Sequence, residues 1–171
     1  PVNNSLNQFH ALVGPDSLIK TNLYEVIRSS SGLIYFAGQE TDLQVLNPET
    51  GKVTQIKMPG INSKEPLSIY NIQEDRRGNL WIGTRYHGFI RYNPKTKSAK
   101  QIDFKNIGEN GATGISFVNN KVFLGYYDYD LVSYDSQSGA VEHSILGLGK
   151  NKDYYDNFIS SIAYWPEENS L

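Results

Sequence analysis

The chain has 171 residues, of which 39% are hydrophobic and 20% are charged, and its formal net charge at pH 7 is −2. This composition is ordinary for a soluble globular protein, and the charge offers no electrostatic attraction to nucleic acid or to an anionic membrane surface. The lack of cysteine excludes disulfide bonds and cysteine-based metal or redox sites.

Comparison of the chain with itself shows that the predicted elements repeat. Residues 8–13 resemble the last strand of a copy, because Phe9 precedes Tyr24 by about the gap that separates Ile56 from Tyr70. The first complete copy, Tyr24 to Ile56, aligns without gaps on Tyr70 to Ile102 at an offset of 46 residues. The identical pairs at this offset include Gly32 and Gly78, Asn47 and Asn93, Pro48 and Pro94, and Thr50 and Thr96.

A tight turn is expected between the first two strands of each copy. Asp75 and Gly78 stand at its ends in the second copy, and Ser29 and Gly32 take the same places one copy earlier. Asp or Ser at the start and Gly at the end are typical of a type I turn. The four strands expected in the second copy are 67–73, 80–84, 88–93 and 100–104.

The turn between the third and fourth strands begins with Asn47, Asn93 and Asp135 in the three copies. Asn or Asp opens such a turn by bonding its own backbone. Lys97 stands where the other copies carry glycine, so this turn is expected either to differ or to hold Lys97 with some strain.

The third copy, residues 113–145, has a shorter first turn. Its Asn119–Asn120 pair tolerates the positive φ of a tight hairpin. Gly125 corresponds to Gly83 at an offset of 42 residues, and a fourth copy begins at Phe158.

The second strand of a copy is apolar on consecutive residues, as in Leu80–Ile82 and Val122–Leu124. A short continuous apolar run indicates that both faces are covered, as in stacked sheets of a radial array. A β-sandwich does not need a repeat of about 46 residues. We therefore predict an all-β chain, a partial β-propeller of about four blades of four-stranded antiparallel sheet, open or part of a larger ring. The expected pieces of this single propeller fragment are the last strand of a preceding blade (6–13), three blades (14–58, 59–106 and 107–146) and the start of a further blade (147–171).

Two segments resemble the two-component regulator propeller repeat. Residues 74–97, EDRRGNLWIGTRYHGFIRYNPKTK, resemble it closely, and residues 15–38 are similar to its lead-in, an Asp-Ser-Leu stretch followed by Asn and the first strand. The first copy departs from the pattern at Ala37–Gly38, and the third lacks the Asp-x-x-Gly turn. The resemblance implies the periplasmic sensor region of a Bacteroides-type hybrid two-component system, ahead of a membrane span and kinase modules. Many members of this family respond to glycan fragments.

No catalytic or metal site is expected from the sequence. His10, His87 and His143 are far apart in the sequence and outside any His-Glu-x-x-His frame, and no Gly-x-Ser-x-Gly elbow occurs. The glycine-rich stretch 108–114 lacks the Lys-Ser/Thr pair of a phosphate loop. The carboxylates within 128–130 are a weak calcium signal without a glycine-centred loop. We therefore expect that the segment is not an enzyme and needs no cofactor.

Ligand-binding residues are expected where loops gather on one face. In a propeller, the loop between strands two and three and the loop between successive blades open on the same face. Tyr, Arg, His and carboxylates suit a sugar there, because aromatic rings cover its C–H patches and polar groups bind its hydroxyls. Arg85 also suits the carboxylate of an acidic glycan. The candidate ligand-binding residues are Arg85, Tyr86, His87, Tyr126, Tyr127, Asp128, Tyr154 and Tyr155.

Three functions are consistent with these patterns. The first is an extracytoplasmic sensing segment, and the second is a protein-binding scaffold, although the Trp-Asp ending of WD repeats is absent. The third is a propeller lyase or hydrolase similar to the streptogramin lyases, for which His87 is the only candidate acid or base.

Expected partners are an oligosaccharide, the remaining blades of a parent protein and a second copy that pairs with open blade edges, but no nucleic acid. No apolar run reaches membrane-span length, so no direct insertion is expected, and we interpret the start at Pro1, without a signal peptide, as a processed or engineered boundary.

Overall fold

The computed structural model describes residues 22–102, 111–126, 130–145 and 162. All regular elements in these ranges are β-strands, and they form three four-stranded antiparallel sheets. The first sheet contains β1 (Leu23–Arg28), β2 (Ile34–Gly38), β3 (Leu43–Asn47) and β4 (Lys52–Ile56). The second contains β5 (Ile69–Glu74), β6 (Leu80–Thr84), β7 (Phe89–Asn93) and β8 (Ser98–Ile102). The third contains β9 (Ala112–Val118), β10 (Lys121–Tyr126), β11 (Asp130–Asp135) and β12 (Val141–Ile145).

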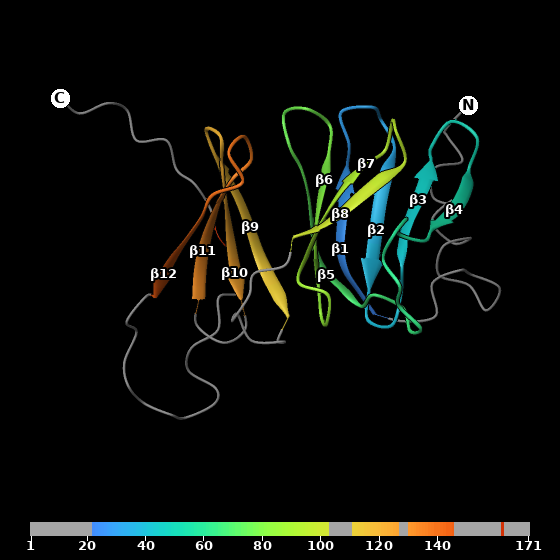
Figure 1. Cartoon of the computed structure of the whole chain (residues 1–171). Helices are drawn as coiled ribbons and strands as arrows, with labels where there is room; N and C mark the ends of the chain where they lie inside the picture. The colour runs from blue at the N-terminus through green and yellow to red at the C-terminus, as the bar shows by residue number, and fades with distance from the viewer. Residues whose placement is uncertain (1–21, 103–110, 127–129, 146–161, 163–171) are drawn as a thin grey trace.

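Each sheet is a simple up-and-down meander, with its strands hydrogen-bonded in sequence order. Figure 1 shows the three sheets standing one after another. The first strands of the sheets converge, since β1 contacts β5 and β5 contacts β9. Successive four-stranded meanders stacked in this way are propeller blades. The predicted all-β propeller architecture is confirmed, and the sandwich alternative is excluded because each copy forms a sheet of its own.

The core consists of two apolar layers, one on each side of the middle sheet. The first layer joins Tyr35 and Leu43 of the first sheet to Ile82 of the second. The second layer joins Trp81 to Leu124 of the third sheet. Because side chains alternate along a strand, neighbouring residues of β6 enter different layers, and all five residues of this strand are buried. The continuous apolar run at Leu80–Ile82 therefore arises, as predicted, because both faces of this strand are covered.

The outer strand of the middle blade begins earlier than the sequence suggested. It was expected at residues 100–104, whereas β8 is Ser98–Ile102. The turn after β7 closes within four residues, so that Asn93 pairs with Ser98. Lys97 completes this turn with a φ of 54°, so the residue adopts the strained left-handed conformation that its position indicated.

The expected turn chemistry is present in all three sheets. The Asn93 side-chain oxygen accepts hydrogen bonds from the backbone N–H groups of Lys95 (2.9 Å) and Thr96 (3.0 Å). Asn47 and Asp135 open the corresponding turns in the same way. In the third sheet Asn119 has a φ of 55°, as the tight hairpin requires. The strand expected at 6–13 and the further blade expected at 147–171 lie outside the described residues, apart from Ile162.

Candidate ligand-binding site

The antiparallel meanders place their connections at two opposite ends of the sheets. One end holds the turns that follow the first and third strands of each sheet, and we call it the turn end. The other end holds the β2–β3 and β6–β7 loops and the starts of β1, β5 and β9, as the pairs Leu23–Gly38 and Ile69–Thr84 show. We call this second end the rim. It is the end at which the sequence predicted ligand-binding residues.

The β6–β7 loop presents two of the predicted binding residues to solvent. The guanidinium carbon of Arg85 lies 5.0 Å from the centroid of the Tyr86 ring, and Tyr86 is 62% exposed. The loop is held closed by Thr84, whose hydroxyl donates to the Gly88 carbonyl and accepts from the His87 N–H, both at 2.9 Å. These hydrogen bonds fix the backbone of the short loop, and the cation–π contact holds the two side chains together before a ligand arrives.

Ser68, just before β5, joins the rim loops of two neighbouring blades. Its hydroxyl accepts a hydrogen bond from the Glu40 N–H at 3.0 Å, and its carbonyl accepts one from the Arg85 N–H at 3.0 Å. Ser68 is buried and has a φ of 51°, and Glu40 has a φ of 54°. Non-glycine residues in this conformation are held there by their surroundings and often occur at functional sites. Ser68 therefore fixes the Arg85 loop against the first blade.

The remaining predicted site residues are placed as follows. His87 is half-buried, and its carbonyl accepts a hydrogen bond from the Gln101 side chain at 3.1 Å. Tyr126 is only 3% exposed, and its ring packs edge-on against Phe89 at a centroid distance of 5.3 Å, so it offers no aromatic face to a ligand at the rim. The other predicted residues, Tyr127, Asp128, Tyr154 and Tyr155, lie outside the described part of the chain.

Sequence reasoning missed a group of residues near the starts of β1, β5 and β9, which are the first strands of the three sheets. Each of β1, β5 and β9 has a register shift at the same place, and the residues it displaces are Tyr24, Tyr70 and Thr113. The rings of Tyr24 and Tyr70 are 5.3 Å apart, between centroids, with their planes inclined at 38°. The signal available in the sequence was that both tyrosines keep the 46-residue offset.

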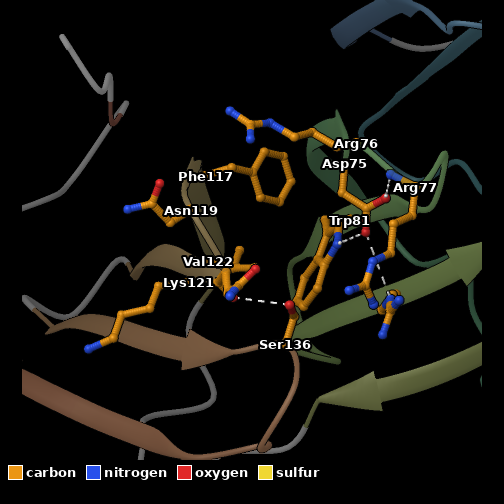
Figure 2. A pocket seen from close by; sticks show the side chains of 11 residues that line it. Asp75, Arg76, Arg77, Trp81, Phe117, Asn119, Lys121, Val122 and Ser136 are labelled. Atoms are coloured by element: carbon orange, nitrogen blue, oxygen red, sulfur yellow. Dashed lines mark hydrogen bonds and ion pairs between the residues drawn. The ribbon is translucent and has the colours of Figure 1, made fainter.

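The turn end contains a cavity of about 370 Å³ between the second and third sheets. Figure 2 shows the Trp81 indole and the Phe117 ring in its wall, with the Asp75 carboxylate beside the indole nitrogen. The guanidinium of Arg91 lies 5.8 Å from the Trp81 ring centroid. The lining residues are Asp75, Arg76, Arg77, Trp81, Arg91, Phe117, Asn119, Asn120, Lys121, Val122 and Ser136.

The carboxylate in this cavity is already occupied by hydrogen bonds. Asp75 accepts from the Trp81 indole N–H (3.1 Å), from the Asn79 side chain (2.8 Å) and from the backbone N–H groups of Arg77 and Asn79 (both 2.9 Å). Burial alone would raise the pKa of Asp75, but these hydrogen bonds outweigh it and lower the pKa. Asp75 is thus an ionised structural group, in line with its expected role in the turn, and is unsuited to proton transfer near neutral pH.

The described residues contain no group of three or more His, Asp or Glu side chains that could hold a metal ion. Over the same residues, no helix is long and apolar enough to cross a membrane.

Comparisons with known proteins agree with this architecture. Residues 64–86 match the family described as "Two component regulator propeller", which confirms the resemblance seen in the sequence. The extracellular domain of a one-component system from B. thetaiotaomicron matches with 25% identity and a TM-score of 0.68, over 87% of this chain and 20% of that one. The extracellular domain of a hybrid two-component system from the same organism has 20% identity and a TM-score of 0.61, over 76% of this chain and 18% of that one.

A computationally designed protein, Ika4, shares the fold at 12% identity and a TM-score of 0.60, over 86% of this chain and 82% of that one. No curated protein matches the chain at a significant level. The chain spans about a fifth of the length of the one-component system's extracellular domain, with which it shares 25% identity.

Proposed function

We propose that this chain, which carries a two-component regulator propeller repeat at residues 64–86, is part of the extracytoplasmic sensing region of a membrane-bound two-component regulator. The extracellular domains of the Bacteroides systems support this proposal, because the similarity in fold covers most of this chain. Fold alone does not assign function. The ligand must therefore be argued from the rim.

We propose that the ligand is a glycan fragment and that the segment binds it without catalysis. The observation that carries this proposal is the exposed Tyr86 ring with the Arg85 guanidinium held over it. Aromatic faces cover the C–H surfaces of sugar rings, while a guanidinium donates hydrogen bonds to hydroxyls or pairs with a carboxylate. Thr84 and Ser68 fix the loop backbone that carries this pair, which reduces the backbone entropy lost on binding.

A double substitution in the intact receptor tests this function. Arg85→Ala with Tyr86→Ala removes both exposed groups and leaves the Thr84 and Ser68 hydrogen bonds to the backbone in place. We expect the transcriptional response to oligosaccharides to be lost, while the unfolding free energy changes by only about 0.5 kcal/mol or less. The measurement is a reporter assay over a panel of plant and host oligosaccharides, with circular dichroism of the purified chain.

The matched control is Arg76→Ala with Arg77→Ala, which removes two exposed cations at the turn end. This control should retain the full response. An unchanged response from the rim variant would reject the Arg85–Tyr86 site. A wild-type receptor that responds to protein partners but to no oligosaccharide would favour the scaffold function instead.

A further inference from the structure

The first strands of the three blades, β1, β5 and β9, each have a β-bulge at the equivalent position. In β1, β5 and β9 the pairing with the next strand skips one residue at the rim, namely Tyr24, Tyr70 and Thr113. A bulge re-aims the side chain of its extra residue and interrupts the alternation of the strand. The same device therefore points one side chain per blade away from the regular pattern, and in two neighbouring blades that side chain is tyrosine.

The two tyrosines form a paired and partly exposed aromatic surface. Their ring centroids are 5.3 Å apart, a distance typical of aromatic pairs, and Tyr24 is 44% exposed. The Tyr24 hydroxyl donates to the Gln39 side chain at 3.1 Å, so the ring is held at both ends. An exposed ring that is fixed before binding loses little conformational entropy when a ligand covers it.

The backbone beneath the pair fixes its position. A Cβ atom at Gly111 would lie only 2.6 Å from Cε2 of Tyr70, so the glycine permits the backbone to lie directly against this ring. The same Cβ position lies 3.8 Å from Cα of Arg85, which places the aromatic pair next to the Arg85–Tyr86 loop. The buried Gly111 therefore packs against both the Tyr70 ring and the Arg85 backbone, so the tyrosine pair and the loop are neighbours.

A polar contact between β1 and β5 lies one residue further along each strand. The Asn71 side-chain N–H group donates to the Glu25 carboxylate at 3.2 Å. Burial raises the pKa of Glu25, and a hydrogen bond from the Val26 N–H only partly offsets this effect. The contact holds the two bulges at a fixed separation. It also places a carboxylate and an amide beside the rings, on a strand that exposes the apolar side chains of Leu23 and Val26 as well.

From this geometry we infer that Tyr24 and Tyr70 form a stacking platform for one sugar ring of an oligosaccharide, with Arg85 and Gln39 placed to bond its hydroxyls. The inference rests on the proposed glycan-sensing function and gives that function a specific site. Sugars are the ligand class that fits, because their rings pair C–H faces with a periphery of hydroxyls. An apolar peptide side chain would bury the rings but would offer no acceptor to the exposed Arg85 guanidinium of the neighbouring loop.

Binding of the 171-residue chain to defined oligosaccharides tests this inference. The probes are fragments of cellulose, xylan, mannan and polygalacturonate, and the readout is isothermal titration calorimetry. We expect Tyr24→Ala and Tyr70→Ala each to weaken the affinity for the bound fragment by about tenfold. Tyr24→Phe keeps the stacking face and should weaken binding by only about twofold. Tyr24 is partly exposed, so its variants retain the fold even if Tyr70→Ala proves unstable.

Val26→Ala is the matched control, because Val26 is 54% exposed on the same strand and does not contribute to the platform. Its affinity should equal that of the wild type. Gly111→Ala should weaken binding without removing a ring, because the added methyl group displaces Tyr70.

Unchanged affinity in both tyrosine-to-alanine variants overturns the platform, as does a wild-type chain that binds none of the probes. The receptor assay separates this failure from failure of the proposed function. A receptor that responds to an oligosaccharide equally well with Tyr24→Ala keeps its function and loses the platform. A receptor that responds to no oligosaccharide loses both.

Discussion

Polar and aromatic side chains bond to one another at the turn end of the sheets, whereas two candidate binding side chains at the rim face solvent. At the turn end, Asp75, Asn79, Trp81 and Asn93 bond to one another, and the Asn79 side-chain oxygen accepts from Asn93 at 3.0 Å. At the rim, Tyr86 is exposed and makes its cation–π contact with the likewise exposed Arg85. These bonded residues hold the blade together, whereas the candidate binding groups, some of which also fall within the matched segment 64–86, lie in a loop and at bulges. Matching the repeat therefore identifies the fold more directly than the ligand.

The same division holds at the junction of the first two blades. Glu74 at the end of β5 accepts hydrogen bonds from the Ser30 N–H (2.6 Å) and from the Ser30 hydroxyl (2.8 Å). This contact clamps neighbouring turns at the turn end. The equivalent junction at the rim uses the Ser68 backbone and hydroxyl, which leaves the longer side chains of Glu40 and Arg85 available. Changes at the turn end should alter stability, and changes at the rim should alter binding.

The largest effect on stability is expected from Trp81→Ala. Trp81 is fully buried, donates its indole N–H to Asp75, and packs against Phe117 and Tyr134 at centroid distances of 6.2 and 5.7 Å. Removing a buried Trp typically costs about 3–5 kcal/mol, a large share of the stability of a domain. Urea unfolding followed by circular dichroism measures the loss. A loss well below 1 kcal/mol would show that the second and third sheets do not depend on this layer.

A smaller effect with a defined pH dependence is expected from Asp75→Asn. The amide NH₂ would replace the oxygen that accepts from Trp81 and Asn79. The N–H groups of Trp81 and Asn79 would then face another hydrogen-bond donor instead of an acceptor. Losing hydrogen bonds to a charged acceptor costs about 2 kcal/mol near neutral pH.

The pKa of Asp75 is lowered from its usual 3.8, so its stabilising contribution is complete above this value and is lost as the pH falls through the folded-state pKa. The difference in unfolding free energy between wild type and Asp75→Asn should therefore be largest near neutral pH and should shrink in acid. Urea titrations at neutral pH and below pH 3.8 provide the comparison. A difference that is constant with pH would contradict a structural role for the ionised carboxylate.

The blade architecture was accessible from the sequence because its determinants are local. Asp75 and Asn93 fix turns through their own backbone, and the spacing between them sets the strand lengths. The bulges at Tyr24 and Tyr70 were not accessible, because a bulge is a property of pairing between two strands. The inward direction of Tyr126 could have been inferred, since it continues the alternation of the buried Val122 and Leu124.

The smallest expected effects come from a matched pair of glycine substitutions, Lys97→Gly at the turn end and Ser68→Gly at the rim. Both residues have left-handed φ values, 54° and 51°, which cost about 1 kcal/mol in a residue with a side chain. Lys97→Gly relieves this strain without losing a described hydrogen bond, so it should raise the unfolding free energy by about 0.5–1 kcal/mol. Ser68→Gly relieves similar strain but removes the acceptor for the Glu40 N–H, so its net effect should be close to zero.

Binding separates the two glycine variants more clearly than stability does. Ser68→Gly releases the Glu40 loop from the second blade and should weaken oligosaccharide binding, whereas Lys97→Gly should leave binding unchanged. Thermal unfolding and calorimetric titration of both variants measure the two effects side by side. If Ser68→Gly binds as well as the wild type, the hydrogen bond between the blades does not organise the rim. The strain at Ser68 would then be a feature of the fold alone, as it is at Lys97.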